Sequence, residues 1–229
     1  KYLPDGLDTI IGALLLAPAA RLIAFAADPV VNAAMEYIGM TITAATEQSP
    51  VIMGFLLGGI MKMICTSPLS SMALTAMLGL TGLPMGIAAI ACVAGSFTNG
   101  ILFARLHLGD RSNVIAVMLE PLTQAHIITR YPIPIYASDF LGGGLAGIAA
   151  ALLGIVNNAP GTASPIPGLL APFAFNPAGK VVLALAIGAA SGIFAGLVGS
   201  FVFKRFATGE KASVKAPVQV SGTALPSKV

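Results

Sequence analysis

Glu120 is the residue whose type and setting most strongly indicate chemistry. A proline follows it directly, and Thr123 and Gln124 lie three and four positions further on. Residues with this spacing share one face of a regular helix, so a carboxylate, a hydroxyl and an amide would face one cavity. These donors and acceptors suit a polyhydroxylated ligand, because a hydroxyl group both donates and accepts hydrogen bonds. The alternative is structural, with Glu120 paired to Lys62 or Arg130.

A second group of polar side chains lies in residues 157–178, a segment with five prolines and no charge. Asn157, Asn158 and Thr162 are its ligand candidates. A loop facing lipid could not satisfy its backbone, and a loop facing water is normally more polar. We therefore expect this segment to line a cavity. An ordinary external proline-rich loop is the alternative.

Asn99 and Glu47 complete the candidate substrate-binding residues. Asn99 follows Thr98 within an apolar run, where such side chains either face a cavity or bond their own helix backbone. Glu47 precedes an expected helix start, where capping and the helix dipole explain a carboxylate equally well.

Motifs for other chemistry were not found in the sequence. It contains no phosphate-binding P-loop, no zinc-protease or serine-hydrolase motif and no Cys/His cluster with metal-ligand spacing. Cys65 and Cys92 lie singly in apolar runs, which is typical of small buried residues. We predict no catalytic residue, no metal and no cofactor. Whether the chain belongs to an enzyme stays open, and at most it is the permease subunit of one.

The composition indicates a membrane protein. Hydrophobic residues make up 56% of the 229 residues and charged residues only 9%, against about 25% charged residues in an average soluble domain. Uncharged runs extend over Met63–Ala104, Phe140–Gly179 and Val181–Phe203, and each is long enough for a spanning helix. These continuous runs do not alternate as barrel strands do. The net charge of +3 does not indicate a nucleic-acid partner.

Pairs of a capping residue and a proline mark several expected helix starts, because proline is well tolerated at the first helical position. These pairs are Asp28-Pro29, Ser49-Pro50, Ser67-Pro68 and Asn176-Pro177. We expect helices at residues 7–27, 29–46, 50–65, 68–80, 83–106, 113–129, 138–156 and 177–205. The predicted fold class is an all-α transmembrane bundle with about six or seven spans and one or two re-entrant or broken elements.

The distribution of positive charge predicts the orientation. Lysines and arginines gather at the C-terminus, which places that end in the cytoplasm. The Arg105–Arg111 loop and Arg130 then also lie on the cytoplasmic side. The helix at 113–129 between them must enter and leave on that side, so we expect it to be re-entrant or broken at Pro121. We divide the chain into a transmembrane domain, 1–205, and a disordered cytoplasmic tail, 206–229.

Glycines four positions apart indicate close helix packing, and a homodimer interface could use the same glycines. They are Gly54 and Gly58, Gly143 and Gly147, and Gly188, Gly192 and Gly196.

Four short stretches carry a family resemblance. They are Thr66-Ser-Pro-Leu-Ser-Ser, Gly95-Ser-Phe-Thr-Asn-Gly, Met118-Leu-Glu-Pro-Leu-Thr-Gln and Pro160-Gly-Thr-Ala-Ser-Pro-Ile-Pro-Gly-Leu-Leu-Ala-Pro-Phe. With them, residues 5–205 resemble the membrane IIC component of bacterial phosphotransferase systems, especially the stand-alone IIC-like proteins that include the perfringolysin regulator.

The resemblance implies a homodimeric helical domain that transports sugars and has re-entrant hairpins around the solute. In related IIC domains a membrane-embedded Glu, often followed by Pro, contacts the sugar, and Glu120-Pro121 is the matching position. The chain shows no counterpart of the phosphorylated His or Cys sites of the IIA and IIB domains. The resemblance therefore implies separate cytoplasmic phosphoryl-carrier proteins as partners.

The leading hypothesis is a IIC-like permease of the bacterial inner membrane. It would carry a small polar solute such as a sugar and would contact membrane lipids. One alternative is a membrane sensor or regulator that kept the fold and lost transport. Another is an ion channel or ion-coupled carrier, suggested by Lys62, Glu47 and Glu120 near the membrane.

Overall fold

The computed structural model describes residues 15–30, 33, 37, 40 and 49–204. The chain divides into two compact units, residues 1–47 and 48–229. In the first unit, residues 15–30 form one helix, so the boundary expected between Asp28 and Pro29 is not present. Most of the expected helix at 29–46, Glu47 and the predicted tail at 206–229 lie outside the described residues.

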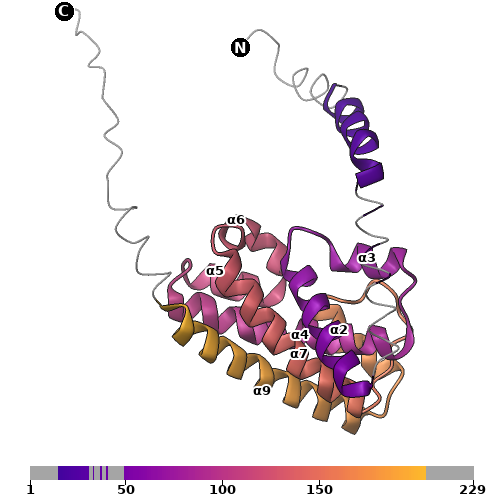
Figure 1. Ribbon diagram of the computed structural model, residues 1–229, viewed down its shortest axis with the longest axis vertical. Coiled ribbons are helices and arrows are strands. Elements are labelled where there is room, and N and C mark those ends of the chain that lie inside the picture. Colours follow the sequence, from indigo (N-terminus) through magenta and orange to yellow (C-terminus); the bar gives the residue numbers. More distant parts are fainter. Residues whose placement is uncertain (1–14, 31–32, 34–36, 38–39, 41–48, 205–229) are drawn as a thin grey trace, which may run out of the picture. The chain divides into compact units, whose positions relative to one another are not determined.

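The described part of the second unit, residues 49–204, consists of helices and their connections (Figure 1). They are α2 (Pro50–Thr66), α3 (Ser71–Met77), α4 (Gly82–Leu106), α5 (Arg111–Leu119), η1 (Pro121–Gln124), α6 (Ala125–Ile128), α7 (Pro132–Leu152), α8 (Pro165–Leu170), η2 (Ala171–Ala174) and α9 (Ala178–Val202). The residues that the structure describes contain no strand, so the prediction of an all-α bundle is confirmed.

Three helices of the described part, α4, α7 and α9, are long and apolar enough to cross a membrane. α2 is apolar but shorter, and so is the stretch Pro165–Ala174. The predicted six or seven spans are therefore not confirmed. α4 is the central helix, because 83% of the residues in its most apolar stretch are buried, against 33% in the corresponding stretch of α9. α9 packs on α4 and α7 along one edge of the bundle (Figure 1).

Prolines set two of the helix boundaries. α5 ends at Leu119, and Glu120 is extended, with φ −152° and ψ 100°. The proline that follows disfavours the helical conformation of the residue before it. The expected helix at 113–129 is accordingly three short elements. α7 begins at Pro132 rather than at residue 138, because Pro132 and Pro134 both fit a first helical turn, where no amide hydrogen is needed.

The start of α5 is a capping box. The Asp110 carboxylate accepts a hydrogen bond from the Asn113 amide, and the Asn113 side chain accepts one from the Asp110 amide, both at 3.0 Å. Hydrogen bonds from the Ser112 hydroxyl and the Asn113 amide hold the pKa of Asp110 below its ordinary value. The cap fixes the direction in which the chain runs toward Glu120.

The glycine pairs of α2 and α7 pack against each other, and the close helix packing that their spacing predicted is present. A Cβ atom on Gly58 would collide with the carbonyl oxygen of Gly143, and one on Gly147 would collide with that of Gly54. α2 and α7 therefore cross with their backbones in contact. Gly188, Gly192 and Gly196 of α9 face α4 instead, where a Cβ on Gly196 would lie 2.9 Å from the carbonyl oxygen of Thr98.

We predict that Gly58→Ala destabilises the protein, by about 1–3 kcal/mol or more, because the added methyl group meets backbone that cannot move aside. The matched control is Gly179→Ala, since a Cβ at that helical position meets no atom within 4 Å. Its expected effect stays within about 1 kcal/mol. Thermal unfolding of the detergent-purified variants measures both. Equal midpoints for the two variants would contradict the tight α2–α7 crossing.

Candidate functional site

Glu120 lies where two irregular segments of the chain meet. The half-buried residue occupies the break between α5 and η1. Its Oε2 atom accepts a hydrogen bond of 2.9 Å from the hydroxyl of Ser164, a buried residue directly before α8. The hydrogen bond therefore connects the segment around Glu120 to the uncharged proline-rich segment 157–178.

Thr123 and Gln124 do not share a helix face with Glu120, because the helix is interrupted at Glu120 itself. This part of the sequence reasoning is wrong in its geometry. The exposed Thr123 donates to the backbone carbonyl of Glu120 at 2.7 Å. The buried Gln124 accepts from the Asn113 side chain at 2.7 Å. Both side chains stabilise the conformation of the chain where the helix is interrupted. The hydrogen bond from the Thr123 hydroxyl also fixes the backbone of Glu120.

Asn157, Asn158 and Thr162 fold the proline-rich segment and attach it to α4. The Asn157 side chain donates to the Thr162 hydroxyl at 2.8 Å and accepts from the Ala159 amide. The Asn158 side chain accepts from the Gly82 amide at 3.1 Å, at the start of α4. The bonds from the Ala159 and Gly82 amides join backbone to side chain, as is typical of asparagine in tight loops. In this structure the three residues are hydrogen-bonded within the protein.

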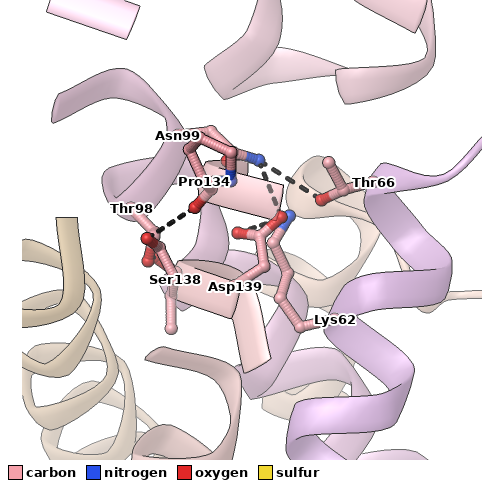
Figure 2. Close-up of polar contacts among 8 residues, drawn as sticks. Lys62, Thr66, Thr98, Asn99, Pro134, Ser138 and Asp139 are labelled. Atoms are coloured by element: carbon pink, nitrogen blue, oxygen red, sulfur yellow. Dashed lines mark hydrogen bonds and ion pairs between the residues drawn. The ribbon is translucent and has the colours of Figure 1, made fainter. Parts of the chain in front are cut away.

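Asn99 belongs to a separate buried cluster (Figure 2). Its Nδ2 atom lies 3.3 Å from Asp139 Oδ2 and 3.2 Å from Thr66 Oγ1. Lys62 Nζ lies 3.9 Å from Asp139 Oδ1. Lys62, Asp139, Asn99 and Thr66 are fully buried and come from three helices, α2, α4 and α7. We call these four residues the charge cluster.

Glycines make room for the lysine. A Cβ atom on Gly95 of α4 would collide with the Lys62 side chain, and one on Gly143 of α7 would lie 2.5 Å from the Lys62 Cβ atom. The aliphatic stem is therefore held between two helix backbones while its ammonium group faces Asp139. A buried charge of either sign would be costly alone, and each one offsets the other here.

Asp139 was missing from the sequence candidates. Residue 138 was the expected start of its helix, and a carboxylate at a helix start needs no further partner. Because α7 begins at Pro132, Asp139 lies about two turns inside the helix. Two prolines in the preceding eight residues were the signal that could have found it. Lys62 was noted as a structural partner for Glu120 and as a charge near the membrane that suggested the ion-channel alternative.

The charge cluster generates a stability prediction. Lys62→Met leaves the Asp139 carboxylate buried without its partner, and we expect it to lower the free energy of unfolding by about 3–5 kcal/mol. The double variant Lys62→Met/Asp139→Leu removes both charges, and we expect it to be about as stable as the unmodified protein or more so. Unfolding of the purified proteins by heat or denaturant measures this difference. Equal losses in the single and double variants would show that the two charges do not compensate each other.

A family model described as "Phosphotransferase system, EIIC" matches residues 1–215. Searches among curated proteins and among solved structures gave no significant match. The family match covers nearly all of the chain and includes both the Glu120 region and the charge cluster. Together with the apolar helices, it makes this a multi-pass membrane protein. The chain belongs to the EIIC family of the phosphotransferase system, whose members are the membrane permease components.

Proposed function

We propose that the chain is the permease for a sugar-like, polyhydroxylated solute and that Glu120 binds this solute. The observation that carries the proposal is the hydrogen bond between Ser164 and Glu120. It joins two irregular segments within one helical unit, and irregular backbone inside a membrane protein is tolerated where it lines a cavity or is buried in protein. Transporter sites are commonly built from such interrupted helices.

The neighbourhood of Glu120 leaves the carboxylate able to accept further hydrogen bonds. A carboxylate has about four acceptor positions, and Ser164 donates to one oxygen of Glu120. A sugar hydroxyl is a suitable donor for the remaining positions. The proposal takes Asn157, Asn158, Thr162, Thr123 and Gln124 as residues that shape the site and reach the solute during transport.

The proposal also covers assembly and orientation. Separate cytoplasmic phosphoryl-carrier proteins would supply the phosphate, and the basic C-terminal end would face them in the bacterial cytoplasm. A homodimer is the expected assembly, because α9 presents apolar side chains to its surroundings. Val182, Leu183 and Phe194 are 57%, 49% and 55% exposed. A second copy and lipid acyl chains are the two candidates that could cover this face.

The charge cluster bears on the ion-coupled alternative. A coupling cation would require uncompensated negative charge, but Lys62 already provides a positive charge beside Asp139. The pair carries no net charge and offers a second cation little attraction. This observation favours the solute permease over the ion-coupled carrier.

The test is solute-dependent stability of the detergent-purified full chain, measured with sugars, polyols and small acids. A ligand at 100 times its dissociation constant stabilises the folded state by about 2.7 kcal/mol. We expect a sugar or polyol to raise the unfolding temperature, and Glu120→Gln to weaken that binding by about tenfold or more, because hydrogen bonds to charged groups contribute about 1.5–3 kcal/mol.

Asp110→Asn is the matched control, since asparagine caps a helix as well as aspartate does. Like Glu120→Gln, it replaces a carboxylate by an amide, but at an exposed residue outside the proposed site. No response to any sugar or polyol would contradict the proposed function. An equal rise in unfolding temperature in the wild type and in Glu120→Gln would show that Glu120 does not bind the solute.

A further inference from the structure

The charge cluster contains polar atoms whose hydrogen-bonding capacity is not used. Within the cluster, the buried atoms Lys62 Nζ, Asp139 Oδ1 and Asn99 Oδ1 have no hydrogen-bond partner; Ser96 Oγ is the other such side-chain atom among the described residues. The ammonium group can donate three hydrogen bonds, and the two oxygens can accept. Leaving such groups unsatisfied at full burial is costly, so each one calls for a partner of complementary chemistry.

The geometry indicates the size of that partner. Lys62 Nζ and Asp139 Oδ1 are 3.9 Å apart, which exceeds the usual 2.7–3.2 Å of a direct hydrogen bond. One oxygen atom placed beside this pair can accept from the ammonium group and donate to the carboxylate. A hydroxyl group or a water molecule has this combination of donor and acceptor, whereas a carbonyl or an apolar group does not.

We propose that Lys62, Asp139 and Asn99 form a second polar site, which binds a hydroxyl oxygen of a neutral polyhydroxylated solute and is hydrated when no solute is bound. The proposal rests on the proposed function and narrows its substrate class. Figure 2 shows the three side chains converging from different helices, with Asn99 bridging toward Thr66.

The charge balance of the cluster selects a neutral solute. One ammonium and one carboxylate lie in the same fully buried place. An acidic solute would meet the Asp139 carboxylate, and a basic one would meet Lys62. A neutral hydroxyl group can accept a hydrogen bond from the Lys62 ammonium group and donate one to the Asp139 carboxylate. Like-charge contacts are especially unfavourable where water is excluded.

The second site lies next to the first one. α2, which carries Lys62, packs against η1, which begins directly after Glu120. The charge of Lys62 also interacts with that of Glu120, although more weakly than with Asp139. A solute with several hydroxyl groups can therefore reach from Glu120 toward the charge cluster as the helices move.

The first experiment measures affinity for neutral sugars and polyols and for sugar acids, using the full chain in detergent. The variants are Lys62→Met/Asp139→Leu, Glu120→Gln and Thr98→Val. Thr98 is the matched control, because it is a fully buried polar residue of α4 that bonds its own helix backbone. We expect the double variant to bind the neutral solute at least tenfold more weakly, and Thr98→Val to bind it as the wild type does.

The outcomes separate the two proposals. Loss of binding in Glu120→Gln together with wild-type affinity in the double variant would leave the proposed function intact and overturn the second site. Tighter binding of a sugar acid than of any neutral solute by the wild type would overturn the neutral substrate class. No binding of any solute by the wild type would reject the proposed function and, with it, the solute role of the second site.

Radiolytic footprinting tests the hydrated site without a solute, because hydroxyl radicals formed from bound water oxidise adjacent side chains. Cys65 is the reporter, since it is buried and lies on α2 three residues after Lys62, on the same face of the helix. We expect its oxidation in the wild type to be at least tenfold faster than in Lys62→Met/Asp139→Leu. Equal rates in the two proteins would overturn the polar site itself.

Discussion

The buried pair of Lys62 and Asp139 constrains the rest of this helical unit. Two opposite charges can remain in an apolar interior only when they stay together, and they belong to different helices, α2 and α7. The glycines meet that requirement by allowing the two helix backbones to touch. Gly95 of α4 and Gly143 of α7 leave room for the lysine itself, where any larger side chain would displace its stem.

Much of this arrangement could be predicted from sequence because it depends on local patterns. The apolar runs predicted α4 and α9 with boundaries close to those observed. The spacing of Gly54, Gly58, Gly143 and Gly147 indicated close helix packing. The spacing could not say which glycine pairs would meet, since that depends on tertiary structure. Asp139 was missed for a related reason: its helix was expected to begin at residue 138, six residues after the observed start at Pro132, so Asp139 was placed at a helix end.

The candidate site shows a different limit of sequence reasoning. Glu120 was found because a charge in an apolar segment is unusual. Its expected neighbours were wrong in geometry, because a periodicity rule for continuous helices was applied across a proline. The partner that does reach Glu120 is Ser164, from a segment 44 residues away. No spacing rule connects residues so far apart, and Ser164 had no charge to make it conspicuous.

The irregular segments obey the same constraint as the charge pair, since polar groups inside an apolar protein must find partners within it. Asn176 illustrates this most directly: its side chain accepts from the Val156 amide at 3.0 Å and donates to the Val156 and Pro172 carbonyls. Asn157 and Asn158 serve the same purpose at the other end of the segment. Asparagine therefore supplies the backbone partners that prolines and breaks remove.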